Sequence, residues 1–198
     1  MKPTIKNINL ENLINHINSR IALTQEEVDL IKKYFIPVET DAQSILLDIG
    51  KIERYIYFLS SGIVKGYQNV NGKIIVEHLV DQRNFFTSLE SFMKETPSLD
   101  CFETVTHCQL LKISKPDLDL LRSHSNKWNA IVEAITNEHL NCKMERVRDF
   151  QMLSAKERYL KFLDQTPNLA LHVSVENIAS FLGMEPQSLS RIRKQITF

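Results

Sequence analysis

The C-terminal segment of the chain carries polar side chains that suit contacts with a DNA duplex. Four of these residues have the spacing of one face of a helix: Gln187, Ser188, Arg191 and Lys194. Amide and guanidinium groups pair with base edges in the major groove, whereas hydroxyl and ammonium groups pair with phosphates. These residue types at this spacing therefore predict a helix whose outer face binds DNA.

Two short helices joined by a tight turn must position this face. Gly183 falls where the first helix ends, because glycine tolerates the left-handed conformation that closes helices. Pro186 falls in the first turn of the second helix, where its missing N–H costs nothing. Apolar residues recur at helical spacing in both segments, namely Ile178, Phe181, Leu182, Leu189, Ile192 and Ile196. We expect them to be buried; an ordinary helical hairpin with a solvated outer face is the alternative.

Individual contacts can be assigned from side-chain chemistry. We expect Arg191 to contact guanine with both guanidinium arms, and Gln187 to contact adenine or a guanine-side variant. Phosphate contacts are expected from Ser188, Arg193 and Lys194, with Ser174 and Ser190 as further donors.

Composition bounds the class of protein. The chain has 198 residues, of which 43% are hydrophobic, so it can bury one large core or two small ones. Its 24 basic and 24 acidic residues cancel, which argues against non-specific coating of nucleic acid. No run reaches the ~20 apolar residues of a membrane span, and the first residues lack the apolar core of a signal peptide. We therefore expect a cytoplasmic protein without membrane contact.

Short apolar runs separated by turn residues fill the middle of the chain. The runs cover residues 44–47, 55–59, 62–67, 73–79 and 109–113. Asn71-Gly72 between two of them predicts a tight hairpin, and several short strands in succession predict a small antiparallel barrel or roll. Helices are expected on both sides, over about residues 10–35, with a new start capped by Thr24, and over residues 114–123.

A long helix is predicted from about residue 126 to 150, with apolar residues on two sides. Leu140, Met144 and Val147 lie on one side. The other side carries the residues that we assign to a dimer interface: Trp128, Ile131, Ile135, His139 and Cys142. Two apolar sides need two partners, of which one is the barrel and the other the same helix of a second copy. A fully buried helix in a monomer is the alternative.

This order of elements resembles the Crp–Fnr family of bacterial transcription regulators. The most specific segments are residues 154–159, 178–183 and 188–193. The resemblance implies an α+β chain divided into a cyclic-nucleotide-binding-like roll with flanking helices (residues 1–125), a dimerisation helix (residues 126–150) and a helix-turn-helix domain (residues 151–198). It also implies a homodimer that binds an inverted-repeat site in double-stranded DNA, with RNA polymerase as a further partner.

The residues that hold a cyclic nucleotide in such rolls are missing here. The glycine and glutamate of the family's phosphate-binding pair are replaced by Thr87 and Ser88, and no arginine occurs between Arg83 and Arg122. A cyclic phosphate needs a guanidinium and close backbone N–H groups, so we expect no binding of cAMP or cGMP. An unknown effector could instead occupy a pocket near Phe86, Ser88, Phe92 and Phe102. A purely structural, empty core is the alternative.

Patterns that carry catalysis or hold metals are missing from the sequence. It has no phosphate loop, no nucleophile elbow and no His–Glu pair at metal spacing, and Cys101, Cys108 and Cys142 do not cluster. We therefore expect a sequence-specific DNA-binding regulator, not an enzyme, without metal or cofactor. The alternative is a small-ligand sensor that acts mainly through protein contacts and binds DNA weakly or non-specifically.

Overall fold

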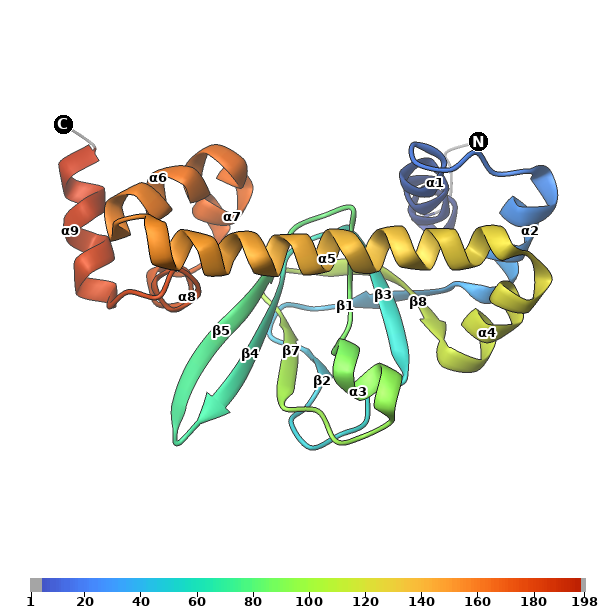
Figure 1. Cartoon of the computed structure of the whole chain (residues 1–198), viewed down its shortest axis with the longest axis horizontal. Helices are drawn as coiled ribbons and strands as arrows, with labels where there is room; N and C mark the ends of the chain where they lie inside the picture. Colours follow the sequence, from blue (N-terminus) through green and yellow to red (C-terminus); the bar gives the residue numbers. More distant parts are fainter. Residues whose placement is uncertain (1–4, 197–198) are drawn as a thin grey trace.

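A β-roll of two antiparallel sheets forms the centre of the computed structural model, which describes residues 5–196 (Figure 1). The strand orders are β1-β8-β3-β6 and β2-β7-β4-β5. The strands are β1 (Ile36–Thr40), β2 (Ile45–Leu47), β3 (Tyr55–Ser61), β4 (Val64–Val70), β5 (Lys73–Val80), β6 (Asn84–Phe86), β7 (Asp100–Thr104) and β8 (Cys108–Ser114). The α+β class and the N-terminal antiparallel roll are therefore confirmed.

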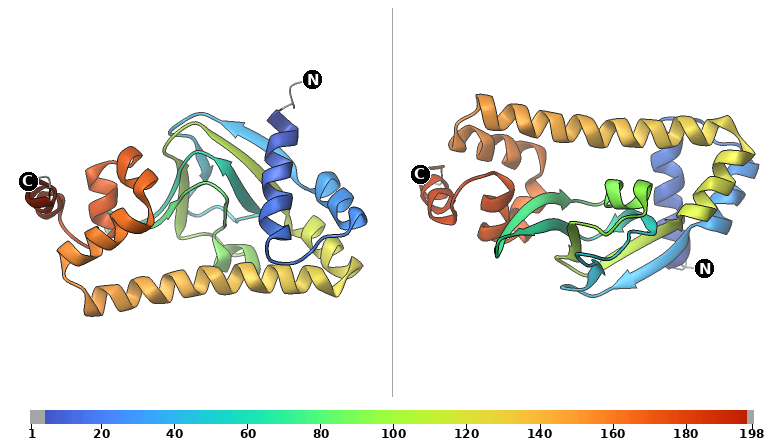
Figure 2. Two further views of the ribbon diagram at one scale, coloured as in Figure 1. Left: turned by 90° about the horizontal axis from the view of Figure 1, so that it is seen from above. Right: turned by 60° about the horizontal axis from the view of Figure 1, so that its bottom comes forward.

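Helices flank the roll at both ends of the molecule. They are α1 (Ile5–Asn18), α2 (Gln25–Tyr34), α3 (Leu89–Lys94), α4 (Lys115–His124), α5 (Asn126–Met152), α6 (Ala155–Gln165), α7 (Pro167–His172), α8 (Val175–Phe181) and α9 (Pro186–Ile196). The rod-like α5 runs along the whole molecule, with α1, α2 and α4 near one end and α6–α9 at the other (Figure 2). Among the described residues, no helix combines the length and apolar character that a membrane span requires.

Local sequence signals explain where several elements begin. Thr24 accepts a hydrogen bond from the Glu27 amide, and the Glu27 side chain accepts one from the Thr24 amide, so a reciprocal cap starts α2. Ser154 starts α6 in the same way with Glu157. Asn71 and Gly72 both have positive φ, at 54° and 85°, as a tight turn between β4 and β5 requires.

Some boundaries differ from the sequence expectation. The helix α5 continues to Met152, and a two-residue connection, Leu153 and the capping Ser154, leads into α6. The second helix that the sequence predicts after Thr24 is α2, as expected, whereas α1 begins at Ile5, earlier than the predicted start near residue 10. Three strands were not predicted, namely β1, β6 and β7, because no apolar run was assigned to residues 36–40, 84–86 or 100–104.

Three apolar cores hold these elements together. The first lies between the outer face of the β1-β8-β3-β6 sheet and the helices α1, α2, α4 and α5. The second fills the roll interior around Phe86 and Phe102. The third unites α6–α9, which we call the tail unit, and it includes Ile63 from the β3–β4 turn, which is 2% exposed. The tail unit therefore shares a core with the roll.

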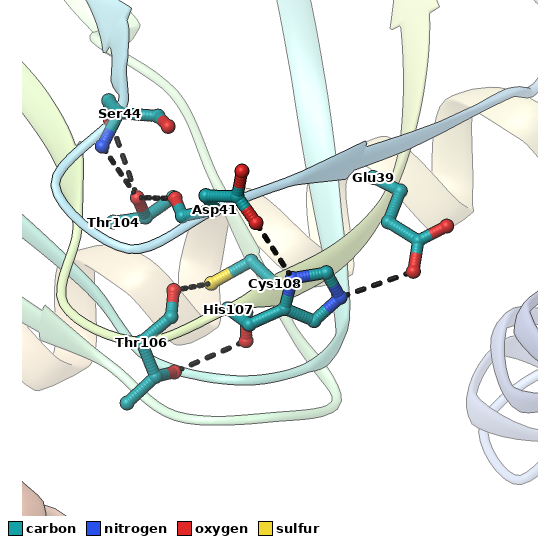
Figure 3. A network of polar contacts seen from close by, with 7 residues as sticks. All are labelled: Glu39, Asp41, Ser44, Thr104, Thr106, His107 and Cys108. Carbon is teal, nitrogen blue, oxygen red and sulfur yellow. Dashed lines mark hydrogen bonds and ion pairs between the residues drawn. The ribbon is translucent and has the colours of Figure 1, made fainter.

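Polar contacts fix the connection between β1 and β2 (Figure 3). The Thr104 hydroxyl donates to the Asp41 carbonyl at 2.6 Å and accepts from the Ser44 amide at 2.9 Å. The exposed His107 ring lies 3.0 Å from a Glu39 carboxylate oxygen and 3.5 Å from an Asp41 carboxylate oxygen. These contacts fasten a loop that lacks regular structure to the β7–β8 hairpin.

Candidate nucleic-acid interface

The helices α8 and α9 form the predicted helix-turn-helix. Ser174 caps α8 by accepting a hydrogen bond from the Asn177 amide. Gly183 closes α8 with a φ of 63°, the left-handed conformation that the sequence predicts for it. The Met184 amide donates to the Ala179 carbonyl at 2.9 Å, which tightens the turn before Pro186 opens α9.

The turn is also held from outside by residues that sequence reasoning did not assign to it. The Arg158 guanidinium on α6 donates to the Leu182 carbonyl at 3.0 Å and to the Leu153 carbonyl at 2.7 Å. The Phe150 ring packs so closely on Gly183 that a Cβ at that position would lie 2.7 Å from a ring carbon. Glycine is therefore required here both for its backbone conformation and for its missing side chain.

The outer face of α9 is solvent-accessible. Gln187, Ser190, Arg191 and Lys194 are exposed, and Ser188 is half-buried. On the opposite side of α9, Leu189 is completely buried, which fixes the orientation of the helix and keeps the same polar face toward solvent. An open groove of about 440 Å³ runs between the start of α8 and α9 and is lined by Val175, Glu176, Pro186, Gln187, Ser190, Arg191 and Lys194. The structure thus brings most of the predicted DNA-contacting side chains to one surface.

Arg193 differs from the other predicted contacts. Its guanidinium donates to the Tyr159 hydroxyl at 2.9 Å and lies over the Tyr159 ring, 5.6 Å from the centroid. Tyr159 is buried in the tail core. The half-buried Arg193 therefore bonds α9 to α6 within the chain, a role that helical spacing alone did not indicate.

The tail unit is attached to the edge strand β5 of the roll. The Ser180 hydroxyl accepts from the Val76 amide at 2.9 Å and donates to the Ile74 carbonyl at 3.3 Å. The side-chain amide of Asn168 donates to the carboxylate of Asp81, which directly follows β5, at 2.7 Å. Because β5 is an edge strand, its outward backbone groups need partners, and Ser180 on α8 supplies them for the Val76 amide and the Ile74 carbonyl.

The predicted dimer interface is wrong for its first two residues. Trp128 is 2% exposed and Ile131 is 5% exposed, and both belong to the core under α1, α2 and α4. Ile135 packs partly against the same core. The two N-terminal helices cover this side of α5, so these side chains are not available to a second copy.

The last two residues assigned to the dimer interface, His139 and Cys142, have a different environment. The His139 ring stacks on the His78 ring of β5, with centroids 5.3 Å apart, and thus faces the chain's own roll. Burial lowers the pKa of both imidazoles, that of His78 to about 3, with the Lys143 ammonium as the next cause for each. Cys142 is exposed as a residue, but partial desolvation of its thiol, followed by the nearby Glu145 and Glu138 carboxylates, raises the thiol pKa.

The second apolar side of α5 is open to solvent. Leu140 is 45% exposed, Met144 68% and Val147 55%. These residues recur at positions i, i+4 and i+7, so they form one line along the helix, which we call the α5 stripe.

The four predicted pocket residues do not share one cavity. Phe86 and Phe102 pack together in the roll interior, with ring centroids 5.2 Å apart, whereas Phe92 belongs to the core under the N-terminal helices. Ser88 is buried and donates to the Asp100 carboxylate at 2.6 Å. The prediction of a single pocket lined by these four side chains is therefore wrong.

A polar network that the sequence did not reveal surrounds Ser88. The Gln68 side chain donates to the other Asp100 oxygen at 2.8 Å, and the Ser98 hydroxyl donates to the Ser88 hydroxyl at 2.9 Å. The Asp100 amide donates to the Ser98 hydroxyl at 2.9 Å. A carboxylate therefore occupies the position next to Ser88 and is bonded through both of its oxygens.

A second carboxyl, that of Glu53, is buried close to this network. Its Oε1 accepts from the Arg54 and Tyr55 amides at 2.9 and 3.0 Å, while its Oε2 has no hydrogen-bond partner among the described residues. Burial raises the pKa of Glu53 to about 7, and the backbone N–H groups oppose that rise. Among the described residues, no group of three or more His, Cys, Asp and Glu side chains is arranged to hold a metal ion.

The sequence matches no protein-family model and no curated protein. The structure nevertheless resembles several solved bacterial proteins. FixK2 from Bradyrhizobium japonicum superposes with a TM-score of 0.71 at 16% identity, covering 82% of this chain and 84% of that one. The c-di-GMP-responsive global regulator CLP of Xanthomonas campestris gives 0.69 at 18% identity, covering 88% and 92%. The catabolite activator protein of Thermus thermophilus gives 0.57 at 18% identity, covering 92% and 86%.

These likenesses extend over the roll, the long helix and the helical tail unit together. At identities below 20% they establish the fold, which is the one that the Crp–Fnr resemblance implies.

Proposed function

We propose that this protein is a homodimeric, sequence-specific DNA-binding transcription regulator of the Crp–Fnr type, and not an enzyme. The observation that carries the proposal is the outer face of α9. Gln187, Arg191 and Lys194 are exposed there on a helix whose opposite side is buried. A helix held by its buried side, with amide and guanidinium groups outward, is what entry into a major groove requires.

Individual contacts follow from exposure and chemistry. Arg191 contacts guanine through both guanidinium arms, and Gln187 contacts adenine. Ser188, Ser190 and Lys194 contact phosphates, and Ser174 adds a donor at the start of α8, a helix end that favours anions. Arg193 serves the fold of the tail unit through Tyr159, and its loss weakens DNA binding indirectly.

The α5 stripe is the surface on which two copies pair. Leu140, Met144 and Val147 leave an apolar line exposed to water, and the same line of a second α5 would cover it. Pairing along a two-fold axis places two α9 helices on one side of the dimer. An inverted repeat with half-sites about one DNA turn apart, ~34–36 Å, is then the expected target. RNA polymerase is the further partner that such a regulator contacts.

We also propose that the roll binds neither cAMP nor cGMP. Asp100 presents a buried carboxylate beside Ser88, and a cyclic phosphate at this place would meet a negative charge. Burying two like charges together without a cation is costly. Supporting evidence would be the absence of heat in calorimetric titration with either nucleotide.

Selection of bound sites from random double-stranded DNA tests the main proposal. We expect an enriched inverted repeat. Gel shifts on it should give about 100- to 10,000-fold weaker binding for Arg191→Ala, because the dimer loses one bidentate contact, worth about 10- to 100-fold, in each of its two half-sites. Arg191→Lys is the matched control for charge, because lysine keeps the phosphate attraction but loses the fork. We expect that variant to lose preference for its guanine and to retain non-specific affinity.

Three results would contradict the proposal. Equal affinity for random and selected DNA with a steep salt dependence indicates non-specific binding alone. No DNA binding at all, with ligand or protein partners recovered instead, favours the sensor alternative. A fully active Arg191→Ala variant with unchanged base preference removes α9 as the base-contacting helix.

Dimerisation has its own test. Met144→Glu places a charge in the middle of the stripe, and light scattering should show a monomer that no longer binds the inverted repeat. Met93→Glu is the matched control, because Met93 is 60% exposed on α3 and lies outside the stripe. A dimer that survives Met144→Glu refutes the assigned surface without refuting DNA binding.

A further inference from the structure

An acidic residue, Glu176, borders the groove between α8 and α9. It lines this groove together with Gln187, Arg191 and Lys194, the side chains proposed to contact DNA. Of the described residues that line the groove, Arg191 and Lys194 carry a positive charge and Glu176 alone carries a negative one. A DNA duplex carries one negative charge for about every 1.7 Å of its axis, so an acid on this surface opposes its approach.

The Glu176 carboxylate is held at the start of α8. Glu176 is the second residue of that helix, and it is exposed. Hydrogen bonds from its own amide and from the Ser174 hydroxyl lower the pKa of Glu176, so the side chain is ionised at neutral pH. The negative charge therefore lies at the surface, beside the groove, and not inside the protein.

No cation in the described part of the chain neutralises this charge. Neither Arg191 nor Lys194 is among the groups that shift the pKa of Glu176, and its carboxylate forms no ion pair with a described residue. Glu185, the acid that directly precedes α9, differs because its carboxylate lies 3.8 Å from the Lys73 ammonium. Glu176 therefore presents an uncompensated charge beside the outer face of α9.

Ser174 connects this charge to a proposed phosphate contact. Its hydroxyl oxygen accepts a hydrogen bond from the Asn177 amide, and its proton is donated to the Glu176 carboxylate. A hydroxyl has one proton, so Ser174 can donate to a phosphate only when it releases Glu176. The carboxylate thus opposes binding of the DNA backbone in two ways, by repulsion and by occupying this donor.

We propose that Glu176 limits the affinity of this protein for the phosphate backbone of DNA, so that base contacts by α9 decide where it binds. This role rests on the proposed DNA-binding function. Non-specific binding depends almost wholly on phosphate contacts, whereas a specific complex adds contacts to base edges. A repulsive carboxylate lowers both affinities by a similar factor, and the contacts to base edges then keep only the specific complex tight enough to persist.

Replacement of the carboxylate by an uncharged amide tests this role. Fluorescence anisotropy measures binding of the full chain to two labelled duplexes, the selected inverted repeat and a scrambled sequence of the same length. At about 50 mM salt, Glu176→Gln should bind both duplexes about 10- to 100-fold more tightly, because each subunit of the dimer loses one repulsive charge worth about 3- to 10-fold. The slope of log affinity against log salt should become steeper by about 1 to 2, and the preferred bases should not change.

Two control variants separate the local charge from the net charge and from side-chain shape. Asp164→Asn removes a negative charge from an exposed position on α6 that does not line the groove, and it should change either affinity by less than about 2-fold. Glu176→Asp keeps the charge and should stay within about 2-fold of the unaltered protein. Thermal melts establish that each variant is folded, and Glu176→Ser provides a second uncharged variant if Glu176→Gln is unstable.

The outcomes distinguish this role of Glu176 from the proposed function. If the unaltered protein binds its selected site and Glu176→Gln binds no more tightly, the role is refuted while DNA binding stands. If neither protein binds any DNA, both proposals fail.

Two further results would overturn the role of Glu176. A changed base preference at one position of each half-site in Glu176→Gln would show that Glu176 contacts a base, such as the amino group of cytosine, and not the backbone. An equal gain in affinity for Asp164→Asn would show that net charge, and not the position of Glu176, sets the affinity.

Discussion

The buried carboxyl of Glu53 makes a quantitative prediction about stability and pH. Its pKa is raised by burial from an ordinary 4.5 to about 7. One pKa unit corresponds to about 1.4 kcal/mol, so the ionised carboxylate destabilises the folded state by about 3 kcal/mol. Glu53→Gln removes the ionisation and keeps an acceptor for the Arg54 and Tyr55 amides.

The sign follows from proton binding. Between pH 4.5 and 7 the folded protein holds a proton on Glu53 that the unfolded chain has released. The contribution of Glu53 therefore lowers the free energy of unfolding as the pH rises from 4.5 to 7. Above about pH 7.5 this contribution no longer changes with pH. Glu53→Gln lacks this contribution. Its free energy of unfolding, compared with that of the unaltered protein, should therefore rise by about 3 kcal/mol as the pH increases from 4.5 to 8.

Urea unfolding followed by Trp128 fluorescence measures this difference at fixed protein concentration. Other titrating groups are common to both proteins and cancel, and any constant effect of the new amide adds the same amount at every pH. Glu11→Gln, on the exposed side of α1, is the control and should show no such change. A stability difference between Glu53→Gln and the unaltered protein that varies by less than about 0.5 kcal/mol over this range refutes the argument.

Two further predictions concern the tail unit. Gly183→Ala should destabilise the fold by about 2–4 kcal/mol, because alanine disfavours the left-handed conformation and its Cβ meets the Phe150 ring. Gly72 has a φ of 85° and open space around it, so Gly72→Ala should show only the conformational cost of about 1–2 kcal/mol. Equal losses in chemical denaturation would mean that Phe150 does not limit this site. Ser180→Ala leaves the Val76 amide without its acceptor, so hydrogen exchange at Val76 should accelerate about 10- to 100-fold, a change of about 1–3 kcal/mol, while Ser190→Ala should leave it unchanged. An unaltered Val76 rate in Ser180→Ala would show that this contact does not hold the tail unit to the roll.

The sequence predicted local elements well where the signal itself is local. Gly183 and Pro186 determine the end of α8 and the start of α9 through their own backbone preferences, and Ser154 determines the start of α6 through its cap. Asn71-Gly72 likewise predicts its hairpin, because both residues accept positive φ. Such signals need no knowledge of distant residues.

Predictions that depend on distant partners were less successful. Periodicity shows that α5 has two apolar sides, but it does not say which side faces α1 and α2 and which faces water. Trp128 and Ile131 were therefore assigned to the dimer, although the chain buries them itself. The position of Arg193 on α9 is compatible with a phosphate contact, and only Tyr159, 34 residues away, shows its use within the fold.

The prediction of a single ligand pocket in the roll was wrong for a related reason. Phe86, Phe92 and Phe102 are close in the sequence of a small domain, but the sheet between them separates Phe92 from the other two. The Ser88–Asp100 bond spans 12 residues, and no spacing rule identifies it. The absence of arginine and glycine in this stretch was visible in the sequence, whereas the carboxylate beside Ser88 was not.

The attachment of the tail unit limits how strongly any effector can act on it. Hydrogen bonds between Ser180 and β5, between Asn168 and Asp81, and between Arg146 and the Glu77 carbonyl join tail and long helix to one edge of the roll. At about 0.5–1.5 kcal/mol each, they oppose displacement of the tail by roughly 2–4 kcal/mol. A ligand shifts this balance only by its difference in affinity between the two arrangements, so it needs about a 30- to 1,000-fold preference.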